Sequence, residues 1–431
     1  MIRGVINQNL CTGCGTCVAL CPEEAIELAI NKKKGIYIPQ LNEEKCNNCG
    51  ICYKVCPGHE VNFKELNLEI FGKEPEDILI GNYLNCYVGH STDHDIRYNS
   101  SSGGIVTQLL IFALEEGMID GALVTRMKKD NPLEPEPFIA RTREEVIEAS
   151  KSKYCPVPAN VALREILEAE EGEKFAVVGL PCHIHGMRKA ENVNEKLKEK
   201  IVLHIGIFCG HSPSFLATEF LLWQMKISEN AVNKLSYRGR GWPGYMQVGK
   251  KDGNKEKVKY GEAWSTGFGI YFFPYRCTLC CDGVCEFSDI SFGDGWLPEL
   301  MKTDKIGTSI IISKTNRGDK VLNNCLTKKK IELKIVDDLS VAESQKAVMK
   351  FKKKSFQARM NILRLYNKKV PSYTFNFQKP SIFDYFNSML FYVKLWISSK
   401  HLWRLMDIYV SIRRYMLGLV GYYIRKCGLI K

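Results

Sequence analysis

A cysteine pattern that occurs twice near the start of the chain constrains this sequence more than any other feature. The pattern is C-x2-C-x2-C-x3-C-P, and it spans residues 11–22 and again residues 46–57. This spacing holds cubane 4Fe–4S clusters by thiolate sulfur. Zinc knuckles and disulfides are the alternatives, but zinc sites rarely use this spacing, and a duplicated copy argues against coincidence. We therefore predict two 4Fe–4S clusters within residues 1–62.

The fourth cysteine of each run is expected to bind the cluster of the other run, as in bacterial two-cluster ferredoxins. One predicted ligand set is therefore Cys11, Cys14, Cys17 and Cys56. The other predicted set is Cys46, Cys49, Cys52 and Cys21. Residues 25–41, between the two runs, are expected to form a helix end, a Lys-Gly turn and a strand.

Length and cysteine content place the chain in a broad class. With 431 residues, 45% of all residues apolar and 18 cysteines, it is too long for a ferredoxin alone and suggests two or three domains. Because cubane clusters need reduced thiolates, we expect a reducing cytoplasm. Met1-Ile2-Arg3 leads into a strand-like segment without a secretory leader. The formal charge of +12 comes without a nucleic-acid motif, so no nucleic-acid partner is expected.

The middle of the chain alternates between expected strands and helices, which predicts an α/β body. The expected strands include residues 119–125, 174–180 and 201–208, and the expected helices include residues 105–116 and 159–169. A Ser-Gly-Gly loop at residues 102–104 leads into the first of these helices. Unpaired amides at such a helix start bind anions well, although a plain N-cap explains the loop equally well.

Two further positions are candidates for chemistry. Pro181-Cys182 follows the strand at 174–180 as a turn, at the strand end where α/β folds place ligands. Four cysteines lie within residues 277–285, a density typical of metal sites. Cys277 and Cys280 are the strongest candidates there by spacing.

The remaining cysteines and histidines receive no catalytic role. We expect ordinary buried thiols, because free cysteine is among the most buried residue types, at Cys86, Cys155, Cys209 and Cys325. Histidines near strand ends are expected to be hydrogen-bonded core or surface residues, namely His183, His185, His204 and His211. No proton donor is assigned.

The C-terminal region is basic and is expected to be helical from about residue 345. One polar stripe recurs at helical spacing, formed by Arg404, Asp407, Ser411, Arg414, Gly418, Gly421 and Arg425. Charges interrupt the apolar run, so a membrane-spanning helix is not expected. The helix either packs on the body or a partner subunit, or makes a peripheral contact with the inner membrane face.

Five motifs taken in chain order resemble the coenzyme F420 hydrogenase/dehydrogenase beta-subunit family. They are Ser102-Gly103-Gly104-x-x-Thr107, Ser152-Lys153-Tyr154, Gly179-x-Pro181-Cys182, Cys277-x2-Cys280 and Asp289-Ile290-Ser291-x-Gly293-Asp294. Members of this family are iron–sulfur flavoproteins that often carry an N-terminal two-cluster ferredoxin module. The resemblance spans residues 1 to about 350.

The resemblance implies FAD and a third 4Fe–4S cluster beside it. The implied flavin-binding residues are Ser102, Gly103, Gly104, Thr107, Ser152, Lys153, Tyr154 and Pro181. The implied third-cluster ligands are Cys182, Cys277 and Cys280, completed by Cys285 or by Cys281. The family does not fix the substrate.

The expected fold is therefore α+β or α/β and multidomain. The expected segments are a ferredoxin-type module at 1–62, a mixed α/β flavin-binding body at 80–165 and 166–350, and a basic helical tail at 351–431. The expected function is electron transfer between the clusters and FAD. FAD would exchange hydride with an organic substrate such as coenzyme F420, and a ferredoxin or another redox subunit would exchange electrons with the clusters. The alternatives are an electron-transfer subunit without its own substrate, and a ferredoxin-dependent reductase of cell-surface glycan or lipid metabolism.

Overall fold

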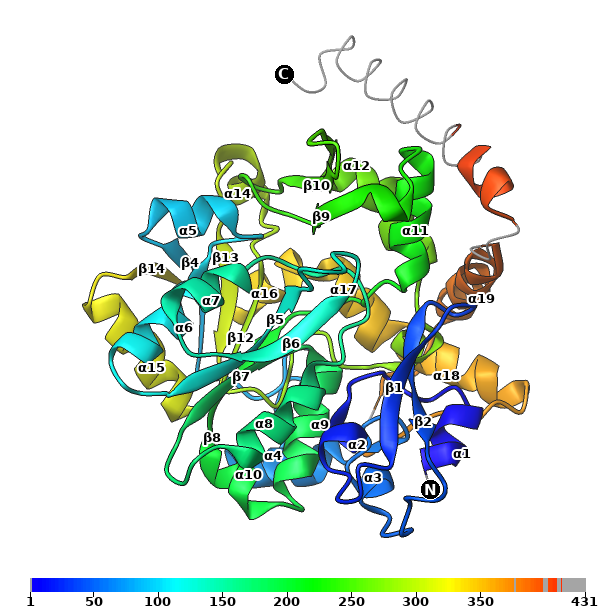
Figure 1. Cartoon of the computed structure of the whole chain (residues 1–431), viewed down its shortest axis with the longest axis horizontal. Helices are drawn as coiled ribbons and strands as arrows, with labels where there is room; N and C mark the ends of the chain where they lie inside the picture. The colour runs from blue at the N-terminus through cyan, green and yellow to red at the C-terminus, as the bar shows by residue number, and fades with distance from the viewer. Residues whose placement is uncertain (1, 376, 398–401, 409–411, 413–431) are drawn as a thin grey trace.

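The protein is organised around one eight-stranded mixed sheet (Figure 1). The structure is a computed structural model that describes residues 2–375, 377–397, 402–408 and 412. In sheet order the strands are β14 Ile331–Val336, β4 Asn85–Ser91, β13 Ser309–Ser313, β12 Ile290–Asp294, β8 Ile201–Ile207, β7 Phe175–Gly179, β5 Gly121–Met127 and β6 Pro135–Ala140. The central strands β12, β8, β7 and β5 are parallel, and antiparallel strands flank them on both sides. This confirms the predicted mixed α/β body.

Helices cover both faces of this sheet, which explains why its central strands are apolar on both sides. They are α5 His94–Asn99, α6 Ile105–Glu115, α7 Arg143–Glu148, α8 Leu163–Glu168, α9 Pro181–Glu191, α10 Glu195–Lys200, α15 Asn316–Thr327, α16 Asp338–Ser344 and α17 Lys346–Met349, whereas α14 Pro298–Thr303 has no buried residue. In β7, Phe175 and Val177 pack in the core formed with α8 and α9, whereas Ala176 packs with α6 and α15. Successive side chains of one strand thus serve opposite layers.

The N-terminal module differs from the expected secondary structure in two places. It contains α1 Ile2–Asn7, α2 Thr16–Ala19, β1 Ile26–Asn31, β2 Ile36–Leu41, α3 Ile51–Lys54, β3 Glu60–Val61 and α4 Phe63–Phe71. The first residues form a helix rather than a strand-like segment. Residues 25–41 form an antiparallel hairpin rather than a helix end and a strand, with Ile26 opposite Leu41. Gly35, at φ +61°, supplies the left-handed position in the turn.

The module and the body share one core. Strand β3 pairs in parallel with β15 Ser372–Tyr373, so the chain after the body returns to the N-terminal module. Buried residues of both parts, including Val55, Phe63, Ile184 and Phe356, form a single apolar cluster. The segments 80–165 and 166–350 also interleave, because β4 lies between β13 and β14. The exact segment boundaries stay predictions.

A smaller three-stranded sheet lies beside the main one, at the top of Figure 1. It consists of β9 Val232–Ser236, β10 Tyr245–Lys250 and β11 Lys255–Lys259, next to α11 Phe215–Gln224 and α12 Tyr260–Ala263. The later helices are α18 Phe356–Leu365 and α19 Ile382–Ile397. Among the described residues, no helix combines the length and apolarity needed to cross a bilayer.

Two sequence-based expectations concern the start of α9 and the C-terminal tail. The segment that starts at Pro181 was expected to be a turn, but it begins helix α9, with Pro181 at the first helical position, where its missing N–H costs nothing. Of the polar stripe in the tail, only Arg404 and Asp407 belong to the described residues. The other five residues of the stripe lie outside them.

Candidate functional site

The structure brings together the four cysteines of the first predicted set. Cys11 lies near Cys14 and Cys56, and Cys17 lies near the same group. Burial and the neighbouring Cys56 sulfur raise the pKa of Cys11 to about 12. The amides of Gly13 and Gly58 donate to the sulfurs of Cys11 and Cys56 at 3.3 Å each. Backbone N–H groups aimed at sulfur stabilise thiolate ligands, so these contacts suit a cluster-binding role.

The second predicted set encloses a small cavity. Cys21, Cys46, Cys49 and Cys52 line a space of about 30 Å³. The fourth cysteine of the first run has therefore crossed to the second run, as the swapped arrangement requires. Cys49 is exposed, whereas Cys14, Cys17 and Cys56 are buried. The second set is thus the one nearer to solvent.

A third group of cysteines forms where the body meets the module. Cys182 lies in the first turn of α9, Cys277 in the short 3-10 segment Tyr275–Leu279, and Cys280 directly after it. Burial raises the pKa of Cys182 well above its ordinary value, and the nearby sulfurs of Cys14, Cys209, Cys277 and Cys280 raise it further. Cys209, which follows β8, belongs to this group although sequence analysis treated it as an ordinary buried thiol.

The two cysteines that were expected to complete this group are placed differently. Cys281 and Cys285 have no exposed surface, whereas Cys182, Cys209, Cys277 and Cys280 all retain some. The Cys285 sulfur lies near Cys182 and Cys209, but it contacts the carbonyl oxygens of Gly179 and Ile207 at 3.5 Å. The structure thus favours Cys209 over Cys285 as the fourth member.

Two buried cations accompany the third group. Arg276 donates to the carbonyl of Gly58 at 2.8 Å and to that of Leu279 at 2.7 Å, so it ties the end of the second cysteine run to the third group. Lys352 is buried beside the sulfurs of Cys280, Cys209 and Cys277. Burial opposes its charge, but these sulfurs outweigh that effect and raise the pKa of Lys352. Both cations suit a site that gathers negative thiolates.

Among the described residues, no three histidine, cysteine or carboxylate side chains converge on a point that one metal ion would occupy. A cubane differs from a single ion because each of its four irons takes one cysteine sulfur, which keeps the sulfurs apart. The all-cysteine composition of the three groups suits iron–sulfur clusters.

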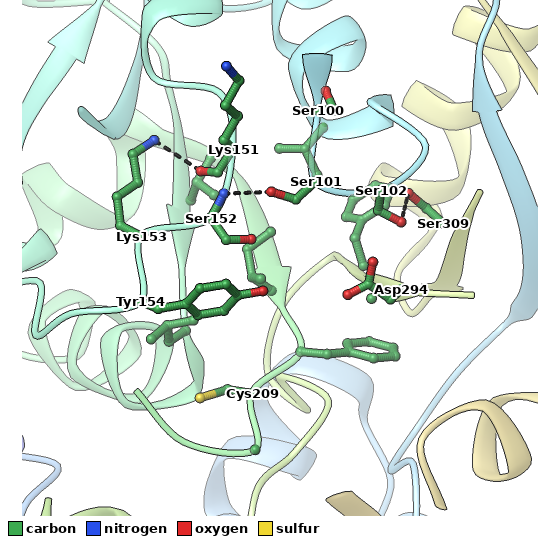
Figure 2. A pocket seen from close by; sticks show the side chains of 18 of the residues that line it. Ser100, Ser101, Ser102, Lys151, Ser152, Lys153, Tyr154, Cys209, Asp294 and Ser309 are labelled. Carbon is green, nitrogen blue, oxygen red and sulfur yellow. Dashed lines mark hydrogen bonds between the residues drawn. The ribbon is translucent and has the colours of Figure 1, made fainter. Parts of the chain in front are cut away.

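A cavity of about 840 Å³ opens beside the third cysteine group (Figure 2). This volume is within the range of small-molecule and cofactor sites. Its lining comes from the loop before α6, the loop at 151–154, and the carboxyl ends of β7, β8 and β12, including Gly179, Ile207 and Asp294. Cys209 lines the same cavity. The cavity therefore lies where parallel α/β sheets bind ligands and directly adjoins the cysteine group.

The start of α6 lines this cavity through Ser102, Gly104 and Ile105. Gly104 has φ +76° and caps the helix without a side-chain hydrogen bond, and Thr107 lines the cavity. At Gly103 any Cβ would meet the Gly89 carbonyl oxygen at 2.5 Å, so only glycine fits there. Ser102 donates to the Thr308 carbonyl at 3.0 Å and thereby holds the loop against β13. First-turn amides of α6 are thus positioned for an anionic group.

Lys153, one of the implied flavin-binding residues, lines the cavity, but its ammonium is held by the backbone of its own loop. Its ammonium donates to the carbonyls of Ala149 and Ser150 at the end of α7, and to that of Lys151, a bond that Figure 2 shows. Burial lowers the pKa of Lys153 to about 7. Lys153 therefore acts on the backbone of its own loop.

Lys151 is the cation that sequence analysis missed. It lines the cavity, and its side chain passes over Gly239. Burial lowers the pKa of Lys151, and the neighbouring charges of Lys234 and Arg240 lower it further. Lys151 thus brings a basic side chain to the lining of the cavity, a suitable setting for an anionic part of a ligand, and Lys234 and Arg240 lie near it.

Tyr154 and Asp294, from two motifs far apart in sequence, meet at Arg238. Arg238 is almost fully buried and donates to Asp294 at 2.6 and 3.1 Å and to the Tyr154 hydroxyl at 3.3 Å. Trp264 packs edge-on against the Tyr154 ring at 5.0 Å. These contacts fix one wall of the cavity.

Ser152 holds the loop at 151–154 through its amide, which donates to Ser101 Oγ at 2.8 Å. Pro181 starts α9 and does not line the cavity.

Asp289, in the same motif as Asp294, has a structural setting. It accepts from the amide of His204 at 2.8 Å and from Thr315 Oγ1 at 2.6 Å. His204 lies between Asp289 and Glu191, and Arg188 donates to Glu191 at 3.0 Å. We refer to Arg188, Glu191, His204 and Asp289 as the buried ionic network.

The other histidines also have partners or stacking contacts. His183 bonds the Val157 carbonyl at 2.9 Å, His185 bonds Asp282 at 3.0 Å, and His211 stacks on Phe273 with ring centroids 3.4 Å apart. His211 lines the cavity. None is assigned a catalytic role.

Fold and site together define an iron–sulfur electron-transfer protein with a cofactor-sized cavity in an α/β body. Residues 86–164 and 172–338 match the N- and C-terminal models for the beta subunit of coenzyme F420 hydrogenase/dehydrogenase, and residues 10–59 match a 4Fe-4S dicluster domain. The chain belongs to the coenzyme F420 hydrogenase/dehydrogenase beta-subunit family, an oxidoreductase family. This confirms the resemblance deduced from the motifs.

Individual relatives agree with this assignment. The chain is 30% identical over 245 residues to the coenzyme F420 hydrogenase subunit beta of Methanosarcina barkeri, over 54% of this chain and 80% of that protein. It is 26% identical over 375 residues to the coenzyme F420-dependent sulfite reductase of Methanocaldococcus jannaschii, over 84% of this chain and 52% of that protein. A solved chain from the F420-reducing NiFe hydrogenase complex of Methanosarcina barkeri has a similar fold, with a TM-score of 0.53, 24% identity, and coverage of 68% of this chain and 98% of that one.

Proposed function

We propose that this protein is an FAD-dependent iron–sulfur oxidoreductase that passes electrons between an organic hydride donor or acceptor and its clusters. The observation that carries the proposal is the shared position of Cys209. This residue belongs to the third cysteine group and also lines the 840 Å³ cavity. A flavin in the cavity would therefore lie against a cluster held by Cys182, Cys209, Cys277 and Cys280.

The residues around the cavity suit the separate parts of FAD. The α6 amides and Lys151 offer positive potential to the pyrophosphate, because unpaired amides and cations both favour anions. Tyr154, fixed by Arg238, offers an aromatic wall for a ring system. Bound FAD would link the two-electron transfer of a hydride to the one-electron transfers of the clusters.

The cysteine groups suit a path for those electrons. Cys182 of the third group lies near Cys14 of the first group, and Cys17 of the first group lies near Cys52 of the second. Two electrons taken from a substrate as hydride would leave one at a time through these groups, and a released proton would pass to solvent. The exposed Cys49 marks the second group as the outer end, where a ferredoxin or another redox subunit would bind.

The substrate class follows from the relatives rather than from the cavity lining. The matched proteins are named for coenzyme F420, so a deazaflavin is the first substrate to assay. We place the protein in a reducing cytoplasm, since the cluster ligands must stay reduced. A relay subunit without its own substrate is the competing function, and it needs no flavin.

Replacing Gly104 with alanine should release the flavin and leave the clusters in place. The left-handed backbone costs alanine roughly 1–2 kcal/mol, and its Cβ would meet the backbone of Arg97 and Ile96 at 3.1 Å. The start of α6 must then shift, so we expect at least about a tenfold loss of FAD affinity, as 1.4 kcal/mol corresponds to tenfold. FAD and iron are both measured on anaerobically purified protein.

The matched control is Gly117, which follows the other end of α6. It has φ +63° but open space around its Cβ position. Gly117→Ala should therefore pay the same backbone cost and keep its flavin. Full FAD occupancy in Gly104→Ala would reject the assignment of the α6 start to the flavin.

A further inference from the structure

We propose that the exposed face of helix α19 docks this protein on the surface of an anionic lipid bilayer. Besides Trp396, six large apolar side chains of this helix are exposed: Ile382, Phe383, Phe386, Met389, Leu390 and Val393. Their accessible fractions run from 45% for Leu390 to 86% for Ile382. The spacing of Ile382, Phe386, Met389 and Val393 places these four on one face of the helix.

The opposite face of α19 holds the helix on the body. Asn361 donates to the Tyr385 hydroxyl at 2.8 Å, and Ser355 donates to Asp384 at 3.0 Å. Phe391 packs edge-on against Phe273 at 5.0 Å. The helix is thus fixed through one face, and within the described chain the six apolar side chains stay accessible. A contiguous apolar surface of this kind marks an interaction site.

The same arrangement continues in the next described segment. Met406 is buried and Trp403 packs against Phe220 at 5.5 Å, which fastens the segment to the body. Leu405 and Ile408, by contrast, are 63% and 57% exposed. Two separate segments are therefore packed on the body while they present apolar side chains outward.

Charge identifies the occupant of this surface. Residues 345–431 contain eighteen lysines and arginines, of which Lys352, Lys353 and Arg359 are buried, and only two acidic residues, whereas residues 1–344 carry a small excess of acidic residues. Exposed basic side chains occur before, along and after the apolar face, at Lys379, Lys394 and Arg404. Anionic lipids attract such a basic segment, and apolar side chains with phenylalanine among them insert at the headgroup boundary.

The surface also lies outside the part of the chain that the family models match, which ends at residue 338. The body common to the family therefore does not include it. Docking through this face requires neither the flavin nor the third cluster.

Sedimentation with vesicles tests the proposal on the full-length, anaerobically purified protein. It should pellet with vesicles of phosphatidylcholine and phosphatidylglycerol at low salt, remain in the supernatant with phosphatidylcholine alone, and bind less as salt screens the charges. The variant Phe386→Ser, Met389→Ser, Val393→Ser should bind the anionic vesicles at least about a hundredfold more weakly. Each apolar side chain that inserts into the bilayer contributes to the free energy of binding, and the variant removes three of them. Unchanged iron content in this variant shows that it folds.

The matched control alters two exposed apolar residues elsewhere, Ile335→Ser and Leu339→Ser, which are 73% and 70% exposed. This control should bind the anionic vesicles as the unaltered protein does. Three results would overturn the proposal: no binding of the unaltered protein at low salt, equal binding by the triple variant, or a dimer in solution that the triple variant abolishes. The last result would assign the face to a second copy of the chain.

Discussion

Replacing both Cys277 and Cys280 with serine should remove about four of about twelve iron atoms per chain, because each cubane holds four irons. The two residues belong to the third cysteine group with Cys182 and Cys209. Loss of two ligands leaves that cluster without its all-thiolate set. The N-terminal cysteines are unaltered, so the remaining eight irons should stay. Iron analysis of anaerobically reconstituted protein measures the difference.

Single replacements decide which cysteine is the fourth ligand. Cys209→Ser should lose the third cluster, whereas Cys285→Ser should keep it, because the Cys285 sulfur is enclosed and contacts two carbonyls. Cys325→Ser is the control for a buried thiol remote from all three groups. If the double variant retains its full iron, the third cluster does not exist. If Cys285→Ser alone loses iron, Cys285 is the ligand.

Replacing Asp289 with alanine should destabilise the fold by roughly 3–5 kcal/mol, the cost of removing one partner from a buried ion pair. Asp289 is one of the two carboxylates of the buried ionic network, and it contacts both His204 and Arg188. The variant removes it. Thermal or denaturant unfolding at neutral pH measures the loss. Asp130→Asn, at an exposed carboxylate, is the control and should change little.

The same network predicts how stability depends on pH. Burial alone would raise the pKa of Asp289, but the hydrogen bond from His204 and the charge of Arg188 outweigh it and hold that pKa well below its ordinary value. A carboxyl group with a lowered pKa stabilises the fold above its unfolded pKa of about 4, and this contribution is lost as pH falls below that value. Unaltered protein should therefore lose more stability on acidification than Asp289→Ala does. Parallel acid profiles would contradict this explanation.

Local spacing explains why the gathering of the N-terminal cysteines into two sets could be predicted. In C-x2-C-x2-C the ligands of one cluster come from one loop, so the sequence itself carries the geometry. The exchange of Cys21 and Cys56 between the runs also follows from the pattern, and the structure brings both residues to the expected sets.

Cys209 was missed because its neighbours are distant in sequence. Strands β7 and β8 are adjacent and parallel, so their carboxyl ends meet at one edge of the sheet. Cys182 and Cys209 follow these strands by two or three residues. A single sequence shows neither which strands are neighbours nor that both run in the same direction, and for this reason the pairing emerged only from the fold.

The contact of the Lys153 ammonium with its own loop could not be predicted from the sequence, for a local reason. Lys151 has φ +73°, which turns the loop so that the two lysines point in different directions. Lysine rarely adopts this conformation, so sequence patterns do not predict it. The hairpin at 26–41 was missed because a short apolar stretch does not distinguish a strand from a helix end.

The most direct test of the central claim is the amount of FAD released per full-length chain after anaerobic purification. We predict about one FAD per chain, since one cavity adjoins the third cysteine group. Protein that retains its N-terminal clusters but releases no flavin, even after incubation with FAD, would contradict the claim. The chain would then be an electron relay without a hydride-exchanging site of its own.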